Sequence, residues 1–374
     1  MPLEVLMADV TLDHVTKRFG QSVAIDDLSL TIADGELVVL LGPTGAGKTT
    51  TLRLVAGLEK PTAGTVEIGG IDVGGWSAAE RDVALVLQQY SLYPRYTVRQ
   101  NLEFPLKSNI RRLPQAEIDQ RVAKAAKTLR IEHLLDRKVD RLSGGEMQRV
   151  SIGRAIVRSP RIFLMDEPLS NLDAKLREAL RSELKDLQMQ LGATFLFVTH
   201  DQIEAMSMGD KVGVLNNGRL AQVGTPHEIY HHPRDTYVAS FVGSPAMNLL
   251  AADLLGDRLR IPSGAIEFPI GAALRARFGR TSGPLTLGIR AEDVHLDPDG
   301  MIDARVWGVE NHGVEKIVTL KAGDCLFKAT MPATTPTDID APMRLSFDQS
   351  KLHLFDAETG LNLSQEGREL QAAE

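Results

Sequence analysis

Apolar and polar residues alternate near the N-terminus and then give way to a continuous apolar run. Residues 10–15 and 28–32 alternate, which is typical of strands with one buried face. Residues 37–41 are all apolar and have the length of a strand buried in a parallel sheet. A helix is predicted to follow and to end near Ala56, where Gly57 provides a left-handed cap. The order of strand, glycine-rich loop and helix favours an α/β domain.

The same signals return in the middle of the chain. Apolar strands are predicted at residues 161–165 and 193–198, with a helix over residues 174–191 between them. From about residue 90 to residue 160 the pattern is mostly helical. We therefore predict a parallel sheet covered by helices, with a helical subdomain at about residues 90–160.

The helical period disappears after about residue 244. Short apolar runs, such as residues 285–290 and 316–320, are separated there by Gly and Pro, which favours a small all-β barrel or sandwich. A chain of 374 residues is long enough for two or three domains. The prediction is an α/β domain over residues 1–243 and a β-rich accessory domain over residues 244–374.

Charge and cysteine usage narrow the functional classes. The chain carries 42 Lys and Arg against 49 Asp and Glu, and its formal net charge is −7. From Ser244 onwards 13 basic and 19 acidic residues leave a net charge of −6, so the larger domain is nearly neutral. A nucleic-acid partner is disfavoured, because no basic excess exists to neutralise phosphates. Cys325 is the single cysteine and cannot form an internal disulfide, which disfavours an oxidising compartment. No apolar run reaches the about 18 residues of a membrane span, so we predict a soluble cytosolic protein.

A glycine-rich segment stands between the apolar strand at residues 37–41 and the helix after it. The segment Gly42-Pro-Thr-Gly-Ala-Gly-Lys48-Thr49 fits the phosphate-binding loop pattern in the context that the pattern requires. Glycines let the backbone wrap phosphates, Lys48 reaches the β- and γ-phosphates, and the Thr49 hydroxyl holds Mg²⁺. A glycine-rich turn that happens to contain lysine is the alternative. The candidate nucleotide-binding residues are Gly42, Pro43, Thr44, Gly45, Ala46, Gly47, Lys48, Thr49 and Thr50.

An acidic pair follows the strand predicted at residues 161–165. Asp166 is expected at the carboxyl edge of the sheet, beside the phosphate-binding loop, where it assists Mg²⁺ binding. Glu167 is suited to polarise the attacking water. Taken alone, such a pair is more often a solvated strand end, but the loop favours the catalytic interpretation.

A third motif, Leu142-Ser-Gly-Gly-Glu146, opens a helix. Ser143 and the backbone N–H groups at the N-terminus of this helix are suited to bind a phosphate, as a second anion-binding helix start. An ordinary helix with Ser143 as its N-cap is the alternative.

Further motifs surround these three. Gln88 lies in Val-Leu-Gln-Gln-Tyr, residues 170–173 read Ser-Asn-Leu-Asp, and His200 follows Phe-Val-Thr. Phe19 lies in Lys-Arg-Phe-Gly near the N-terminus. In this order, the motifs resemble those of an ABC transporter ATP-binding subunit over about residues 8–240.

The resemblance implies ATP and Mg²⁺ as cofactors. It places Phe19 against adenine and Gln88 at the metal with Thr49 and Asp166, and it gives Gln88 and His200 catalytic roles beside Glu167. A buried structural histidine is the alternative for His200. ATP then lies between the loop of one subunit and the signature motif of the other, with the implied contacts Ser143, Gly144, Gly145, Glu146 and Asp173. The family usually has Gln where this chain has Glu146, so we expect weakened activity.

The C-terminal segments are similar to those of carbohydrate importer ATPases of the maltose and glycerol-phosphate group. Residues 224–230, 244–248 and 287–294 carry this similarity. It implies an oligonucleotide-fold-like regulatory domain and a homodimer, or a pair with a close paralogue. It also implies two membrane permease subunits, a solute-binding protein, and a peripheral location on the cytoplasmic face of the bacterial inner membrane. The implied function is uptake of a sugar or sugar-like solute.

Two other functions compete with an importer. One is a soluble ABC ATPase that acts on DNA or ribosomes, which would be expected to carry two cassettes or a long coiled-coil insertion. The other is a regulatory module that holds ATP without turnover, against which Glu167 and His200 argue.

Overall fold

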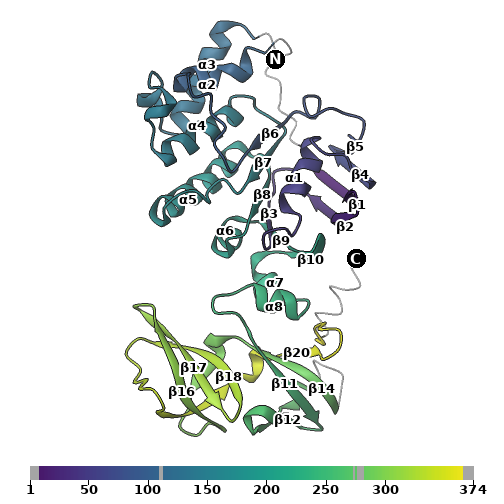
Figure 1. The fold of residues 1–374 in the computed structure, drawn as a ribbon, viewed down its shortest axis with the longest axis vertical. Coiled ribbons are helices and arrows are strands. Elements are labelled where there is room, and N and C mark those ends of the chain that lie inside the picture. Colours follow the sequence, from purple (N-terminus) through teal and green to yellow (C-terminus); the bar gives the residue numbers. More distant parts are fainter. Residues whose placement is uncertain (1–7, 109–112, 273, 276–281, 365–374) are drawn as a thin grey trace. The chain divides into compact units, whose positions relative to one another are not determined.

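The computed structural model describes residues 8–108, 113–272, 274–275 and 282–364 (Figure 1). The chain forms two compact units, Met1–Pro226 and His227–Glu374. The units divide at the first residue of the short helix α7 (Pro226–His231), and the helix α8 (Thr236–Phe241) belongs to the second unit. The domain division at residues 243 and 244 stays a prediction. Within the part of the chain that the structure describes, no helix is both long and apolar enough to cross a membrane.

The first unit contains a four-stranded antiparallel sheet in the order β2-β1-β4-β5. Its strands are β1 (Val10–Phe19), β2 (Ser22–Ile32), β4 (Ala63–Ile68) and β5 (Ile71–Asp72). Residues 28–32 bury every second side chain, as their pattern predicts. In β1 the alternation breaks at His14, which has a φ of 48°, and a register shift there turns Val15 into the core.

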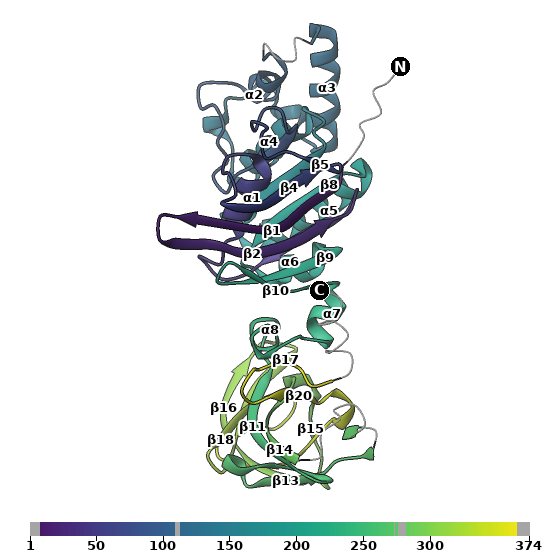
Figure 2. The ribbon, with the colours of Figure 1, turned by 90° about the vertical axis from the view of Figure 1, so that its right-hand side faces the viewer.

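A second sheet has six strands in the order β10-β9-β3-β8-β7-β6 (Figure 1), and Figure 2 shows β2, β1 and β4 of the first sheet side by side. The predicted apolar runs form its buried centre, where β3 pairs in parallel with β8 and β9, and β7 with β8 and β6. The short strand β6 has no prediction in the sequence, since four residues are too few for a periodic signal. The strands are β3 (Leu37–Leu41), β6 (Val83–Val86), β7 (Ile162–Asp166), β8 (Thr194–Thr199), β9 (Lys211–Asn216) and β10 (Arg219–Gly224).

Helices of the first unit fall into two groups (Figure 1). The helices α1 (Lys48–Ala56), α5 (Ala174–Leu191) and α6 (Gln202–Met208) follow β3, β7 and β8. The helical segment predicted at about residues 90–160 contains three α-helices and three 3₁₀ turns. They are α2 (Val98–Glu103), η1 (Phe104–Leu106), α3 (Gln115–Thr128), η2 (Glu132–Leu134), η3 (Val139–Arg141) and α4 (Gly144–Ile156).

The second unit is mostly β-structure, as the sequence predicts. One five-stranded sheet, in the order β13-β12-β11-β14-β20, comprises β11 (Asn248–Leu255), β12 (Arg258–Ile261), β13 (Ile266–Pro269), β14 (Ser282–Ile289) and β20 (His353–Asp356). The other, in the order β15-β19-β16-β17-β18, comprises β15 (Val294–Leu296), β16 (Ile302–Asn311), β17 (Glu315–Ala322), β18 (Cys325–Pro332) and β19 (Pro342–Phe347). The short turns η4 (Pro262–Gly264), η5 (Ala291–Asp293) and η6 (Gln349–Lys351) connect strands. The inward side chains of both sheets form one hydrophobic core.

Two buried arginines hold chain segments together, one in each unit. Arg81 donates to the carbonyls of Leu54 and Val55 in the last turn of α1, and to the carbonyl of Val73. In the second unit, Arg290 donates to the carbonyls of Tyr230 and Val242, and so attaches the segment of α7 and α8 to the β-domain. Buried guanidinium groups satisfy carbonyls that would otherwise lack donors.

Gly57 ends α1 in the left-handed conformation, with a φ of 73°. Gly192 ends α5 in the same way, with a φ of 57°. A Cβ on Gly57 would lie 2.6 Å from the Arg81 Nε atom, whereas a Cβ on Gly192 would meet no atom within 4 Å.

We predict that Gly57→Ala destabilises the chain more than Gly192→Ala. Each change puts alanine into the left-handed region, at a cost of about 1–2 kcal/mol. Only Gly57→Ala also displaces a buried guanidinium. The measurement is the urea dependence of circular dichroism, and equal losses of stability would contradict the role of Arg81.

Candidate functional site

The loop between β3 and α1 is built for close approach of its backbone to a ligand. Gly45 and Gly47 have φ values of 83° and 106°. A Cβ on Gly47 would lie 2.6 Å from the Ile25 Cδ1 atom and 2.8 Å from the Ala24 carbonyl oxygen, so only glycine fits. No side chain caps the start of α1, whose first N–H groups are therefore suited to bind an anion.

Lys48 begins α1, and its side chain is only 5% exposed. Its Nζ atom donates to the carbonyl oxygens of Gly42, at 2.9 Å, and Pro43, at 3.1 Å. Nζ also lies 3.4 Å from Oε1 of Glu167. The ammonium group is thus held inside the loop, with a carboxylate as its counter-ion.

Thr49 and Asp166 form a second pair across the sheet edge. The Thr49 hydroxyl donates to Oδ1 of Asp166 at 3.0 Å. Burial raises the pKa of Asp166, while the Thr49 hydroxyl acts in the opposite direction and the nearby Glu167 raises it further. A hydroxyl and a carboxylate are the oxygen ligands that Mg²⁺ prefers, so this pair fits that cation.

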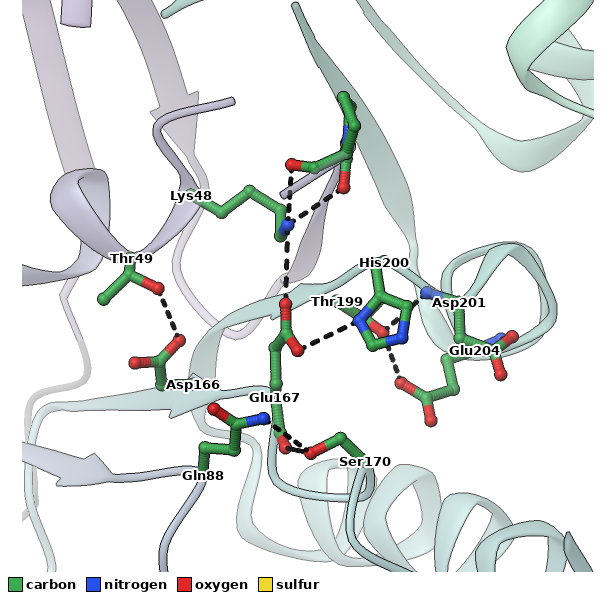
Figure 3. A network of polar contacts seen from close by, with 12 residues as sticks. Lys48, Thr49, Gln88, Asp166, Glu167, Ser170, Thr199, His200, Asp201 and Glu204 are labelled. Atoms are coloured by element: carbon green, nitrogen blue, oxygen red, sulfur yellow. Dashed lines mark hydrogen bonds and ion pairs between the residues drawn. The ribbon is translucent and has the colours of Figure 1, made fainter. Parts of the chain in front are cut away.

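Glu167 lies between Lys48 and His200 (Figure 3). Its Oε2 atom is 2.9 Å from Nδ1 of His200, and its Oε1 faces Lys48. The backbone of Glu167 has a φ of 43°, which is strained for a non-glycine residue and is found mostly at functional sites. Its N–H donates to the Val198 carbonyl at 3.1 Å, which ties this strained turn to β8.

Gln88 contacts the loop that follows Glu167. Its Nε2 donates to Oγ of Ser170 at 3.2 Å, and its carbonyl accepts from Asn171 Nδ2 at 3.0 Å. The Ser170 hydroxyl in turn donates to the Glu167 carbonyl at 2.9 Å. Gln88 is therefore connected through one serine to the backbone of Glu167, the residue that carries the candidate catalytic carboxylate.

The signature segment at the start of α4 forms a capping box. The N–H and hydroxyl of Ser143 donate to Oε2 of Glu146 at 2.7 and 2.9 Å, and the N–H of Glu146 donates to the Ser143 hydroxyl at 3.4 Å. Ser143 is the N-cap of α4, and its predicted contact with a partner's nucleotide stays a prediction. A Cβ on Gly145 would lie 2.4 Å from the Leu176 Cδ2 atom, so a larger residue there would require the Leu176 side chain to move.

Asp173 and Phe19 lie at the ends of other elements. Asp173 caps α5, because its carboxylate accepts from the N–H of Leu176 at 3.0 Å. Phe19 ends β1 with 47% of its surface exposed, and Nζ of Lys17 lies 4.7 Å from its ring centroid. An exposed ring next to a cation is free to stack against a planar ligand.

The structure thus brings most of the predicted site residues together and leaves others apart. The carboxyl edge of the parallel sheet gathers Lys48, Thr49, Asp166, Glu167 and His200. Ser143 and Glu146 lie outside this group, and their side chains bond each other in the capping box. Sequence reasoning missed the supporting residues of the site, which are Ser170 as a bridge, Thr199, Arg177 and Glu204.

Glu204 is a supporting residue whose burial the sequence does not reveal. It is 2% exposed and accepts the Thr199 hydroxyl at 2.6 Å, directly beside His200. Burial raises the pKa of its carboxyl, and the bond from Thr199 acts against that rise. Its one signal in the sequence is its position in the first turn of a helix that Asp201 caps.

At the carboxyl edge of this parallel sheet, a glycine-rich loop with a lysine lies beside two acidic residues. This arrangement defines a P-loop nucleotide-binding protein. Three family models match the chain: "ABC transporter" over residues 25–170, "MalK OB fold domain" over residues 243–294 and "TOBE domain" over residues 287–355.

Whole-length relatives carry the same organisation. The xylose/arabinose import ATP-binding protein XacK of Haloferax volcanii is 48% identical, with 95% of each chain covered. The trehalose/maltose import protein MalK of Thermococcus litoralis is 45% identical, covering 95% of this chain and 99% of its own. The sn-glycerol-3-phosphate import protein UgpC of Ruegeria pomeroyi is 44% identical, covering 96% and 100%.

A solved structure agrees with the first unit. The dimeric post-hydrolysis ATP-binding cassette MJ0796, bound to ADP and phosphate, has a TM-score of 0.52 and 33% identity, and it covers 58% of this chain and 98% of its own. The chain belongs to the family of ATP-binding proteins of ABC importers. It is an ATPase subunit with an OB-fold and TOBE accessory region, and neither competing function is supported.

We predict that Glu146→Gln lowers stability only slightly, because the charge is lost, whereas Glu146→Ala lowers it more. A glutamine oxygen still accepts from Ser143, but alanine removes those bonds, at a net cost of about 0.5–1.5 kcal/mol. The backbone hydrogen bond from Ser143 lowers the pKa of Glu146, so this contribution is present above the ordinary glutamate pKa and is lost as pH falls through the lowered one. Thermal melting at neutral and acidic pH measures both effects, and equal melting of the two variants would contradict the cap.

Proposed function

We propose that this chain powers the import of a sugar or sugar-like solute by hydrolysing Mg·ATP between two copies of its first unit. The observation that carries the proposal is the Glu167 carboxylate, which lies between Lys48 and His200 at the sheet edge where the phosphate-binding loop ends. The solute class follows the relatives, whose names specify pentoses, disaccharides and glycerol phosphate.

The phosphates of ATP are proposed to lie over the loop at residues 42–50. Lys48 then exchanges its contact with Glu167 for the β- and γ-phosphates, and the uncapped start of α1 supplies N–H donors. Phe19 offers its exposed ring to adenine.

Thr49, Asp166 and Gln88 are the proposed holders of Mg²⁺, whose charge would help neutralise the phosphates. Thr49 and Asp166 already face each other at 3.0 Å, and Gln88 reaches the neighbouring Ser170.

Glu167 is the proposed base that orients the attacking water, and His200 the group that contacts the γ-phosphate. Their 2.9 Å contact fixes the carboxylate relative to the imidazole before nucleotide binds. Positioning of this kind is the main contribution that a protein makes to phosphoryl transfer.

The partner subunit is proposed to close the site with its signature motif and the loop before α5, through residues Ser143, Gly144, Gly145, Glu146 and Asp173. The capping box aims the Ser143 hydroxyl at Glu146, so the charge of Glu146 stands next to this anion-binding helix start. A homodimer, or a pair with a close paralogue, would act on two membrane permeases fed by a solute-binding protein. The chain would then lie peripherally on the cytoplasmic face of the membrane.

We predict that Glu167→Gln lowers ATP hydrolysis by at least about a hundredfold, because the amide is a poor base. ATP binding and ATP-driven dimer formation should survive, since Lys48 and the loop are intact. Phosphate release and size-exclusion chromatography with ATP measure the two properties. Glu178→Gln, an exposed glutamate of α5, is the matched control. Hydrolysis by Glu167→Gln at the parental rate would remove Glu167 from the role of base.

A second prediction concerns the solute. The chain, reconstituted with its permeases and solute-binding protein in liposomes, should show higher ATP turnover when a sugar or glycerol phosphate is added. An amino acid is the negative control. Stimulation by the amino acid alone would refute the solute class, while the ATPase assignment would remain.

A further inference from the structure

Two loops of the first unit carry the groups proposed to act on the γ-phosphate. One runs from Glu167 to Asp173 after β7, and the other holds His200 and Asp201 after β8 (Figure 3). The hydrogen bond between Glu167 and His200 is a side-chain contact between these loops, so its geometry depends on how the loops are held together.

Arg177, in the first turn of α5, contacts both loops. Its Nη1 atom lies 3.3 Å from Oδ2 of Asp201, and its Nη2 donates to the carbonyl of Leu172 at 3.1 Å. The side chain is 32% exposed, which leaves the pair partly screened by water but still directional. The guanidinium reaches the two loops with two separate nitrogens held in one plane, whereas a lysine has a single nitrogen at the end of a flexible stem.

Arg177 thus forms a bridge between the two loops, and Asp201, at one end of this bridge, is held by several hydrogen bonds. Oδ1 of Asp201 accepts from the N–H groups of Ile203 and Glu204 at the start of α6, at 2.8 and 3.2 Å. The N–H of Asp201 donates to the Thr199 hydroxyl at 3.0 Å, and that hydroxyl donates to the buried Glu204. In the sequence, His200 lies between Thr199 and Asp201, which are bonded to each other.

The end at Leu172 is equally constrained. Leu172 is 7% exposed, and its N–H donates to the Leu169 carbonyl at 3.3 Å. Nearer the reaction, the Ser170 hydroxyl and N–H both bond the Glu167 carbonyl, at 2.9 and 3.3 Å. Movement of Leu172 is therefore transmitted to Glu167 through a short hydrogen-bonded turn.

We propose that Arg177 is a positioning residue for ATP hydrolysis, which holds the loop of Glu167 against the loop of His200. Arg177 contacts neither Glu167 nor His200 directly, and it acts through Leu172 on one side and Asp201 on the other. The inference rests on the proposed function, because it takes Glu167 and His200 as the groups that act on ATP. Without the bridge, the two loops are free to separate, and the 2.9 Å contact is lost in part of the population.

The first test compares steady-state ATP hydrolysis by the full chain and three variants. Arg177→Met should lower kcat about tenfold to a hundredfold while the KM for ATP changes less than about twofold, because the phosphate-binding loop is untouched. Arg177→Lys should lie between the parent and Arg177→Met, since it keeps the charge that faces Asp201 but has one nitrogen in place of the two that reach the separate loops. Arg181→Met, one turn further along α5, is the matched control and should match the parent.

A second test separates positioning from a general loss of stability. In a His200→Ala background, Arg177→Met should lower kcat by less than about twofold more, because its effect passes through the alignment of Glu167 with His200, which the alanine variant already lacks. Independent losses that multiply in the double variant would overturn the proposal, and so would an Arg177→Met variant with parental kcat. Melting temperatures accompany every assay, and Arg177→Lys serves as the test if the methionine variant does not fold.

The same data distinguish the inference from the function on which it rests. A parent chain without ATPase activity, or one that His200→Ala leaves unchanged, would overturn the proposed function and the inference together. A parent that requires Glu167 and His200 but is indifferent to Arg177 would overturn the inference alone.

Discussion

The Glu167 carboxylate, held between Lys48 and His200, is the contact on which the site depends. One oxygen faces the buried ammonium group of Lys48 at 3.4 Å, and the other faces the imidazole at 2.9 Å. The three side chains come from loops after β3, β7 and β8, which are far apart in sequence. Their contact requires the three parallel strands to be neighbours with their carboxyl ends at one edge. The strained backbone of Glu167 is the local cost of aiming its side chain at this point.

Arginines solve a recurring problem in this chain, which is how to join the ends of elements that share no sequence continuity. Arg81 bonds the last carbonyls of α1, and Arg290 bonds carbonyls of α7 and the segment after α8. Arg177 bonds one carbonyl and one carboxylate across the two loops of the site. Each guanidinium has several donors in a plane, so one side chain can satisfy acceptors from two segments. Arg81 and Arg290 are buried and stabilise packing, whereas Arg177 is partly exposed and joins the two loops that hold Glu167 and His200.

Glu146 connects the local structure of α4 with the proposed reaction. The family usually has glutamine at this position, and either residue can complete the capping box with Ser143. The glutamate adds a negative charge at a helix start that is proposed to face the partner's nucleotide. The weakened activity expected from the sequence therefore has a physical cause that is separate from helix stability.

The sequence by itself determined the central strands of this protein and predicted the chemistry of its site. The apolar runs at β3, β7 and β8 predicted buried parallel strands, and the glycine loop with Lys48 predicted phosphate binding, because strand length, glycine and lysine carry local physical meaning. The strand β6, the burial of Glu204 and the bridge of Arg177 had no local signal. Only the tertiary structure decided these, since burial and hydrogen bonding between distant segments depend on which strands become neighbours, and a period in the sequence does not contain that information.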